Sequence, residues 1–153
     1  MSPNIILAIT NLSAILPIYL SVIHNDRYTA AVLLAVAIAS FLSHLVENHK
    51  HGMPGIGFPR IISIVLNKID VVCCIFVFAR IGYISVATYV SKIFWLIINK
   101  NIYLYALPLI LNIVSEYDKY NPKYKYFYVW IHSVWHISIF ISIYFFLLNY
   151  IYV

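Results

Sequence analysis

Long apolar stretches are the feature that most constrains how this chain can fold. Six such blocks recur, and polar or turn-forming residues separate one from the next. A helix needs roughly 20 apolar residues to cross a bilayer, so the pattern predicts an all-α integral membrane protein with several crossings. The expected spans are residues 4–23, 28–46, 61–79, 81–98, 101–115 and 127–151.

The charge content supports the same class of protein. Hydrophobic residues make up 63% of the 153 residues and charged residues only 10%, whereas a soluble domain has roughly a quarter charged residues. We expect one transmembrane domain over residues 1–153, because nothing resembles a linker or a soluble domain. The net charge of +5 is spread over scattered Lys and Arg residues, so it does not indicate a nucleic-acid partner. The sequence leaves the oligomeric state open.

Several segments between or inside the blocks carry local predictions. The first block has no positively charged start and no convincing cleavage site, so we expect a retained helix and not a signal peptide. Residues 47–60, "ENHKHGMPGIGFPR", contain glycines and prolines that stop helices and should form the longest loop. Residues 117–128, "YDKYNPKYKYFY", combine tyrosine and lysine as membrane interfaces do. Adjacent Cys73 and Cys74 are not expected to form a disulfide.

Ionisable side chains inside the apolar blocks are candidates for function. Each costs several kcal/mol in a bilayer unless it is paired, hydrated or bound to a metal. Lys68 and Lys92 are long enough to reach the interface with their charged ends. The other candidates are harder to explain as structural residues: His44, Asp70, His132 and His136.

The spacing of His132 and His136 predicts a shared ligand. Residues four apart lie one turn apart on the same helix face, and two imidazoles placed so can bind one metal ion. The alternative is that nearby hydroxyl groups or interfacial water satisfy both rings. His44 is the candidate third ligand, while His24, His49 and His51 are reserve ligands in loops.

Two more residues complete the inventory of a metal-dependent hydrolase. Catalytic zinc sites combine three protein ligands with an open water position. Asp70 could hold or deprotonate that water. Ser40, one turn before His44 in "SFLSH", could hydrogen-bond the water or a developing oxyanion.

The order of these residues resembles the CREST superfamily of membrane proteins, which includes alkaline ceramidases, adiponectin and progestin receptors and myomaker-like proteins. That pattern has a serine and a histidine on the second helix, an aspartate on the third and HxxxH on the last. Ser40-x3-His44, Asp70 and His132-x3-His136 match all five positions. The stretch "YVWIHSVWHISIFISIYFFLL" is most similar to the myomaker-like branch.

The resemblance implies a seven-helix fold and a zinc ion held by His44, His132 and His136. It implies that metal-activated water cleaves a lipid amide or ester, with Asp70 handling the water and Ser40 assisting the oxyanion. The substrate would be a sphingolipid or a glycerolipid, reached through a lateral opening. The alternative is a non-enzymatic membrane-remodelling or fusion protein with a structural zinc site. A third possibility is a b-type haem between His44 and His132.

The number of crossings decides whether the histidines can meet. His44 lies near the end of the second span, and His132 and His136 lie near the start of the last. With six spans those helix ends face opposite sides of the membrane, and with seven they face the same side. We therefore expect six to seven transmembrane helices. Seven allow a metal site near one membrane face, whereas six would require the site to lie deep in the centre of the bundle.

Overall fold

The regular elements of the chain are helices. A computed structural model describes residues 2–88 and 102–152, and no strand occurs in those ranges. The all-α prediction is confirmed. The elements are α1 (Pro3–Thr10), the 3-10 turn η1 (Asn11–Ala14), α2 (Ile15–Ile23), α3 (Arg27–Val46), α4 (Arg60–Thr88), α6 (Ile102–Ser115), the 3-10 turn η2 (Pro122–Tyr124), α7 (Lys125–Phe146) and the π-helical turn η3 (Leu147–Ile151).

Four of the described helical segments are long and apolar enough to cross a membrane. They are Pro3–Ile23, Arg27–Val46, Arg60–Val86 and Pro122–Ile151, and the apolar helix Ala106–Ser115 is shorter. Many large apolar side chains point outward; Ile61 is 65% exposed and Trp130 is 72% exposed. An apolar exterior of this kind suits contact with lipid tails, so the pattern agrees with the predicted multi-pass membrane protein.

The expected break between spans 61–79 and 81–98 is wrong. Helix α4 continues through Arg80 to Thr88. Arg80 lies 20 residues beyond Arg60, about 30 Å along the helix axis, which is the thickness of a bilayer core. Arg80 does not end the helix, and it lies at the distance from Arg60 at which a bilayer-spanning helix would reach the opposite interface. Lys92 and the rest of the fourth expected span fall outside the described residues, and the count of six to seven helices is not confirmed.

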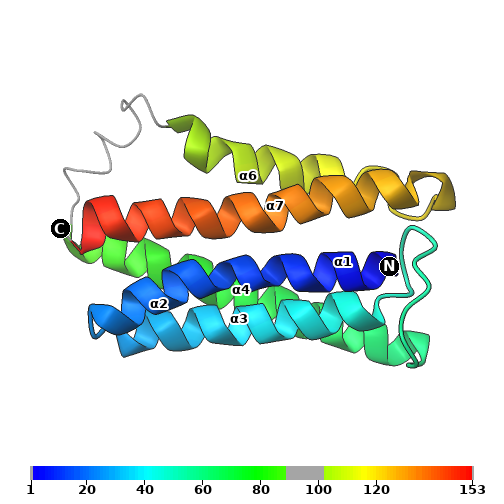
Figure 1. Ribbon diagram of the computed structural model, residues 1–153, viewed down its shortest axis with the longest axis horizontal. Helices are drawn as coiled ribbons and strands as arrows, with labels where there is room; N and C mark the ends of the chain where they lie inside the picture. Colours follow the sequence, from blue (N-terminus) through cyan, green and yellow to red (C-terminus); the bar gives the residue numbers. More distant parts are fainter. Residues whose placement is uncertain (1, 89–101, 153) are drawn as a thin grey trace.

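The long helices run side by side along one axis (Figure 1). Helix α3 packs against α4, α1 and α2, and α7 packs against α6 and α1. The N-terminus, residues 47–59 and residues 116–124 lie together at one end of the bundle, which we call the loop end. The turn at residues 24–26 and the C-terminus lie at the opposite end.

The loop between α3 and α4 forms where the sequence predicts it. Gly52, Gly55 and Gly57 all have positive φ angles, between 63° and 70°, which glycine adopts without steric strain. A Cβ on Gly55 would also come within 2.9 Å of the Val46 carbonyl oxygen. Cys73 and Cys74 are free thiols, as expected.

Two apolar clusters hold the bundle together. The larger cluster fills the middle of the bundle and the end opposite the loop end, and the smaller one lies at the loop end. The buried members of the larger cluster are Ala14, Leu20, Leu33, Val36, Val77, Ile84, Phe140, Ile143 and Leu147. The smaller cluster consists of Leu7, Met53, Tyr128 and Val129.

Candidate metal centre

Three buried histidines converge between α3 and α7. One potential ligand atom from each of His44, His132 and His136 lies within 4.8 Å of the others, so the group could hold a metal ion. The three ring centroids are 4.7 to 4.9 Å apart and the ring planes meet at 64° to 80°. His132 and His136 share one face of α7, as their spacing predicts, and His44 meets them from the last turn of α3.

The histidines meet because their helix ends share the loop end. Helix α3 ends there at Val46, and α7 begins there at Lys125. Helix α4 leads away from this end, and α6 reaches Ser115 beside His132. The condition that both helix ends face the same side is thus met by the described helices.

Each of the three histidines has one ring nitrogen in hydrogen-bonding contact with a polar partner. The Nδ1 atom of His44 lies 3.0 Å from a carboxylate oxygen of Glu47. The Nδ1 atom of His132 lies 2.9 Å from the hydroxyl of Ser115, and that of His136 lies 2.8 Å from the hydroxyl of Thr10. Such partners fix ring orientation at metal sites.

The partners also determine which nitrogen carries the proton. The Ser115 hydroxyl donates its only proton to the Asn112 carbonyl at 2.7 Å, so it must accept a hydrogen bond from Nδ1 of His132. Thr10 donates to the Leu7 carbonyl at 2.7 Å and in the same way accepts from His136. Nδ1 is therefore protonated, and Nε2 keeps its lone pair.

Two ring nitrogens in this group have no hydrogen-bond partner among the described residues and are available to bind a cation. Nε2 of His44 and Nε2 of His136 are buried without a hydrogen-bond partner in the described part of the chain. A buried polar atom left unpaired costs about 1–3 kcal/mol, and lone pairs facing one another repel. A metal ion held by the Nε2 atoms would relieve both effects.

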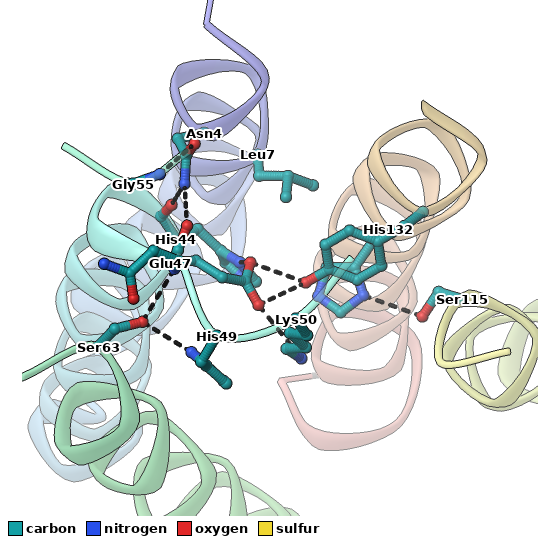
Figure 2. A network of polar contacts seen from close by, with 12 residues as sticks. Asn4, Leu7, His44, Glu47, His49, Lys50, Gly55, Ser63, Ser115 and His132 are labelled. Atoms are coloured by element: carbon teal, nitrogen blue, oxygen red, sulfur yellow. Dashed lines mark hydrogen bonds and ion pairs between the residues drawn. The ribbon is translucent and has the colours of Figure 1, made fainter. Parts of the chain in front are cut away.

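Glu47 anchors His44 from a fully buried position (Figure 2). The Tyr128 hydroxyl donates to its carboxylate at 2.9 Å, and Lys50 Nζ lies 3.4 Å away. Burial alone would raise the pKa of Glu47, but the hydrogen bonds from His44 and Tyr128 and the charge of Lys50 lower that pKa to about 2. Glu47 is therefore an ionised carboxylate, which accepts a hydrogen bond from Nδ1 of His44.

Asn4 on α1 fixes the chain just after His44. Its side-chain amide donates to the carbonyls of His44 and Glu47, both at 2.8 Å, and its carbonyl oxygen accepts from the backbone of Gly55 at 3.2 Å. Figure 2 shows these bonds joining α1 to the end of α3. A buried side chain thus caps the free carbonyls at the end of α3 and holds the turn that positions Glu47.

The reserve ligands lie outside the group of three. His49 Nδ1 lies 2.7 Å from the Ser63 hydroxyl. His51 is buried and stacks on Tyr128, with ring centroids 4.2 Å apart. His24 stacks on Tyr152 at the opposite end of the bundle. None of these rings belongs to the described group that could hold a metal.

Asp70 and Ser40 lie beside the histidines and not among the possible ligands. A cavity of about 370 Å³ is bordered by His44, His132 and Asp70, and Trp135 also lines it. Asp70 is 8% exposed, and the Cys74 thiol donates to its carboxylate at 3.8 Å. Ser40 in turn shares a smaller cavity with His136. This placement suits a carboxylate that acts on a molecule within the cavity.

The arrangement is unsuited to a b-type haem. Two axial histidines must face each other across a porphyrin ring. Here the rings of His44 and His132 are 4.9 Å apart between centroids and lie edge to face, and His136 packs against both. No space for a macrocycle lies between them.

Sequence reasoning missed Thr10, Glu47 and Ser115, the three partners of the histidines. Glu47 had a weak signal, because it follows His44 by three residues in "HLVE" and can face it from the next turn. Ser115 and Thr10 had none, since serine and threonine commonly bond the backbone inside apolar helices. The prediction that hydroxyl groups satisfy the histidines is right for one nitrogen of each α7 ring.

Comparison with known proteins gives one close relative. The chain is 45% identical to "Uncharacterized protein L282" of Acanthamoeba polyphaga mimivirus over 150 residues, which cover 97% of this chain and 99% of the relative. No family model matches the chain. No solved structure matches it either.

Proposed function

This chain belongs to the same family as the mimivirus protein L282, and we propose that it is a zinc-dependent hydrolase that cleaves a lipid amide or ester within the membrane. The order of Ser40, His44, Asp70 and the His132–His136 pair, which resembles the CREST superfamily, first suggested this chemistry. The geometry of the three-histidine group supports it.

The observation that carries the proposal is the set of free Nε2 atoms. His44, His132 and His136 each bring one potential ligand nitrogen within 4.8 Å of the others, and Nε2 of His44 and Nε2 of His136 are buried without a hydrogen-bond partner in the described part of the chain. Imidazole is a preferred ligand of zinc, and catalytic zinc sites use three protein ligands and leave one position open. Glu47, Ser115 and Thr10 supply the outer partners that such histidines require.

Asp70 and Ser40 can each take a separate role in the proposed hydrolysis. A bound zinc ion supplies Lewis acidity, which lowers the pKa of water and polarises a carbonyl oxygen. Asp70 borders the cavity and can accept a proton from the attacking water and return it to the leaving group. Ser40, which lines the neighbouring cavity with His136, can assist the developing oxyanion.

The cavity favours catalysis over the alternative, a structural zinc site in a membrane-remodelling protein. Structural zinc sites are closed by four protein ligands. The described group offers three, and a cavity of about 370 Å³ adjoins two of them. Helices α4 and α6 both line this cavity, and among the described residues no Cα of one lies within 8 Å of a Cα of the other, a separation that suits a lateral route for an acyl chain.

The first experiment is elemental analysis of purified protein. We expect about one zinc per chain in the wild type, near-complete loss in His132→Ala, and full retention in the control His24→Ala, whose ring lies at the opposite end of the bundle. The same three proteins are then incubated with a ceramide and a glycerophospholipid, and released fatty acid is measured.

The outcomes separate the two functions. Zinc with fatty-acid release that His132→Ala abolishes supports the hydrolase. Zinc that stabilises the protein without any fatty-acid release supports the structural site. Folded wild type without zinc, purified without chelator, contradicts both.

A further inference from the structure

A second cavity, of about 280 Å³, lies at the loop end and is strongly basic. It forms where the start of α4 faces the segment after α6. Four Lys or Arg side chains and one Glu line it, together with a histidine, an asparagine and two apolar residues. The members are His49, Lys50, Arg60, Ile64, Asn67, Lys68, Glu116, Lys119 and Tyr120. We call it the basic pocket.

Most of the positive charge in the basic pocket is uncompensated. Lys50 is bound between Glu47 and Glu116, with Nζ 2.8 Å from the Glu116 carboxylate. Arg60, Lys68 and Lys119 are exposed, and none has an acidic partner within 4.0 Å in the described ranges 2–88 and 102–152. Three free cations around one cavity attract an anion that carries more than one charge.

The basic pocket adjoins the cavity of the metal centre. Lys50, Asn67 and Glu116 line both cavities. In the metal-site cavity, α4 continues from Asn67 and Asp70 to the apolar side chains Val71, Ile75 and Phe78. From Asn67 to Phe78 the helix rises about 16 Å. One continuous surface of α4 therefore passes from cationic to polar to apolar, with the histidines beside its middle part.

This order matches the parts of a phosphate-bearing lipid. We propose that the basic pocket binds the phosphate headgroup of the substrate, that the amide or ester bond lies at the three-histidine centre, and that the acyl chain follows α4 toward Phe78. The inference rests on the proposed hydrolase and names its substrate class: a glycerophospholipid or a phosphosphingolipid, in preference to ceramide or diacylglycerol.

Phosphate suits the pocket better than other headgroup chemistry does. Arg and Lys bind phosphate through charge-assisted hydrogen bonds, and Arg can do so with two parallel bonds. A neutral hydroxyl headgroup would leave Arg60, Lys68 and Lys119 without a counter-charge. A free phosphate ion would satisfy these cations, but it would not use the apolar part of the surface at Val71, Ile75 and Phe78.

Lipid binding in a neutral maltoside detergent tests the proposal by native mass spectrometry. The probes are phosphatidic acid and ceramide 1-phosphate, each compared with its neutral counterpart, diacylglycerol or ceramide. The variant Arg60→Gln/Lys68→Gln/Lys119→Gln removes the free cations. The matched control Arg27→Gln/Lys123→Gln/Lys125→Gln removes the same charge from residues that do not line the pocket.

We expect the wild type and the control to prefer both phosphorylated lipids. At about a tenfold effect or less for each cation near a membrane surface, the pocket variant should bind them 10- to 100-fold more weakly and keep its zinc. Equal binding of phosphorylated and neutral lipids, or an equal loss in the control, overturns the proposal. Inorganic phosphate that binds as tightly as the phosphorylated lipids also overturns it.

Two further measurements separate this inference from the proposed function. If His132→Ala lacks zinc and activity but still prefers phosphorylated lipid, the pocket stands independently of hydrolysis. If the wild type releases fatty acid equally from neutral and phosphorylated lipids and the pocket variant is unimpaired, the hydrolase stands and the headgroup pocket is overturned. If the triple variant fails to fold, Lys68→Gln and Arg60→Gln are each compared with Arg27→Gln by the same criteria.

Discussion

The hydroxyl protons of Ser115 and Thr10 determine the tautomers of the two histidines in α7. Ser115 and Thr10 give their protons to backbone carbonyls, so they can only accept from His132 and His136. Hydroxyls inside helices commonly donate to a carbonyl in the preceding turn of their own helix. Because this bond uses their only proton, these two hydroxyls can only accept from the histidines. A residue that looks structural thereby fixes the tautomer of a ligand.

Removing one of these acceptors should weaken metal binding without removing a ligand. We expect Ser115→Ala or Thr10→Val to lower metal affinity by about 10- to 100-fold, as changes to outer partners of metal ligands do. Competition with a chelator of known affinity measures the change. Ser85→Ala is the control, because it removes a similar hydroxyl–carbonyl bond, to Ile81, away from the site. Equal affinities in all three variants would contradict the assigned tautomers.

Asp70 should be needed for turnover and not for metal binding. It lies outside the group of possible ligands but borders the same cavity. Asp70→Asn should therefore keep its zinc and lose about 10²- to 10⁴-fold in rate, the usual effect of removing a general acid–base. Metal content and fatty-acid release are measured on the same sample. Loss of zinc would make Asp70 a ligand, and unchanged turnover would rule out its proposed role.

The sequence could reveal the candidate ligands because ionisable residues stand out in apolar blocks. His44, Asp70, His132 and His136 carry that signal individually, and the HxxxH spacing adds a helical register. Glu47 could not be chosen, since a glutamate just outside an apolar block normally faces water. Its burial depends on contacts with Tyr128 and Lys50. Tyr128 is distant in the sequence, and Lys50 lies in a turn whose shape the sequence does not predict.

At the scale of helices, α4 contains a charged residue, Arg80, that the packing of neighbouring elements stabilises inside the helix. Arg80 Nη2 lies 2.9 Å from Asp26, the N-cap of α3, and Arg80 Nε donates to Thr29 at 3.0 Å. The hydroxyl of Tyr152 also donates to Asp26, at 3.1 Å. From hydropathy alone, Arg80 predicts the end of a helix. A hydropathy profile contains no information on the contacts of Arg80 with Asp26 and Thr29. Only the packing of α3 on α4 shows that the helix continues.

Loss of the N-cap should destabilise this end of the bundle. Asp26 accepts a bond from the backbone of Thr29 at 3.0 Å, and replacing a capping Asp by Ala typically costs about 1 kcal/mol. Because Arg80 also loses its partner, we expect Asp26→Ala to be destabilised by about 1–3 kcal/mol. Thermal unfolding in detergent measures the change, with the exposed Asp118→Asn as the control, because asparagine also tolerates the positive φ of that position. An unchanged melting temperature would contradict the role of the cluster.

The same carboxylate should make stability depend on pH. Burial would raise the pKa of Asp26, but hydrogen bonds from Thr29 and Tyr152 and the charge of Arg80 hold that pKa below its ordinary value of 3.8. A lowered folded-state pKa means that the stabilisation is complete above the unfolded-state value and is lost as the pH falls. The advantage of wild type over Asp26→Asn should thus be constant near neutral pH and shrink below about pH 4. Melting temperatures from pH 7 to pH 3 test this, and a constant difference would refute it.

At the scale of the whole molecule, the direction of each helix brings the site together. The loop end carries residues 47–59 and 116–124, and the turn at residues 24–26 lies at the other end. The sequence predicted the requirement that the ends of α3 and α7 share one side. Hydropathy divided the helix α4 at Arg80, and the predicted count of six to seven crossings is not confirmed.

Topology can be tested with single cysteines in a Cys73→Ser/Cys74→Ser background. Pro54→Cys and Tyr120→Cys lie in the two loops of the loop end, and His24→Cys lies in the opposite turn. In sealed vesicles, a membrane-impermeant maleimide should label positions 54 and 120 from the same side and position 24 from the other. Labelling of 54 and 120 from opposite sides would place His44 and His132 at different membrane faces and contradict the metal centre.

The metal centre draws on helices from across the described sequence. Thr10 comes from α1, His44 from α3, Asp70 from α4, Ser115 from α6, and His132 and His136 from α7. During synthesis α1 and α3 are translated before α7, so the three histidines can come together only after α7 has been made. If the group holds a metal ion, as proposed, all three histidines can bind that ion only late in biogenesis, and a tightly held ion would report that helix insertion and packing have been completed.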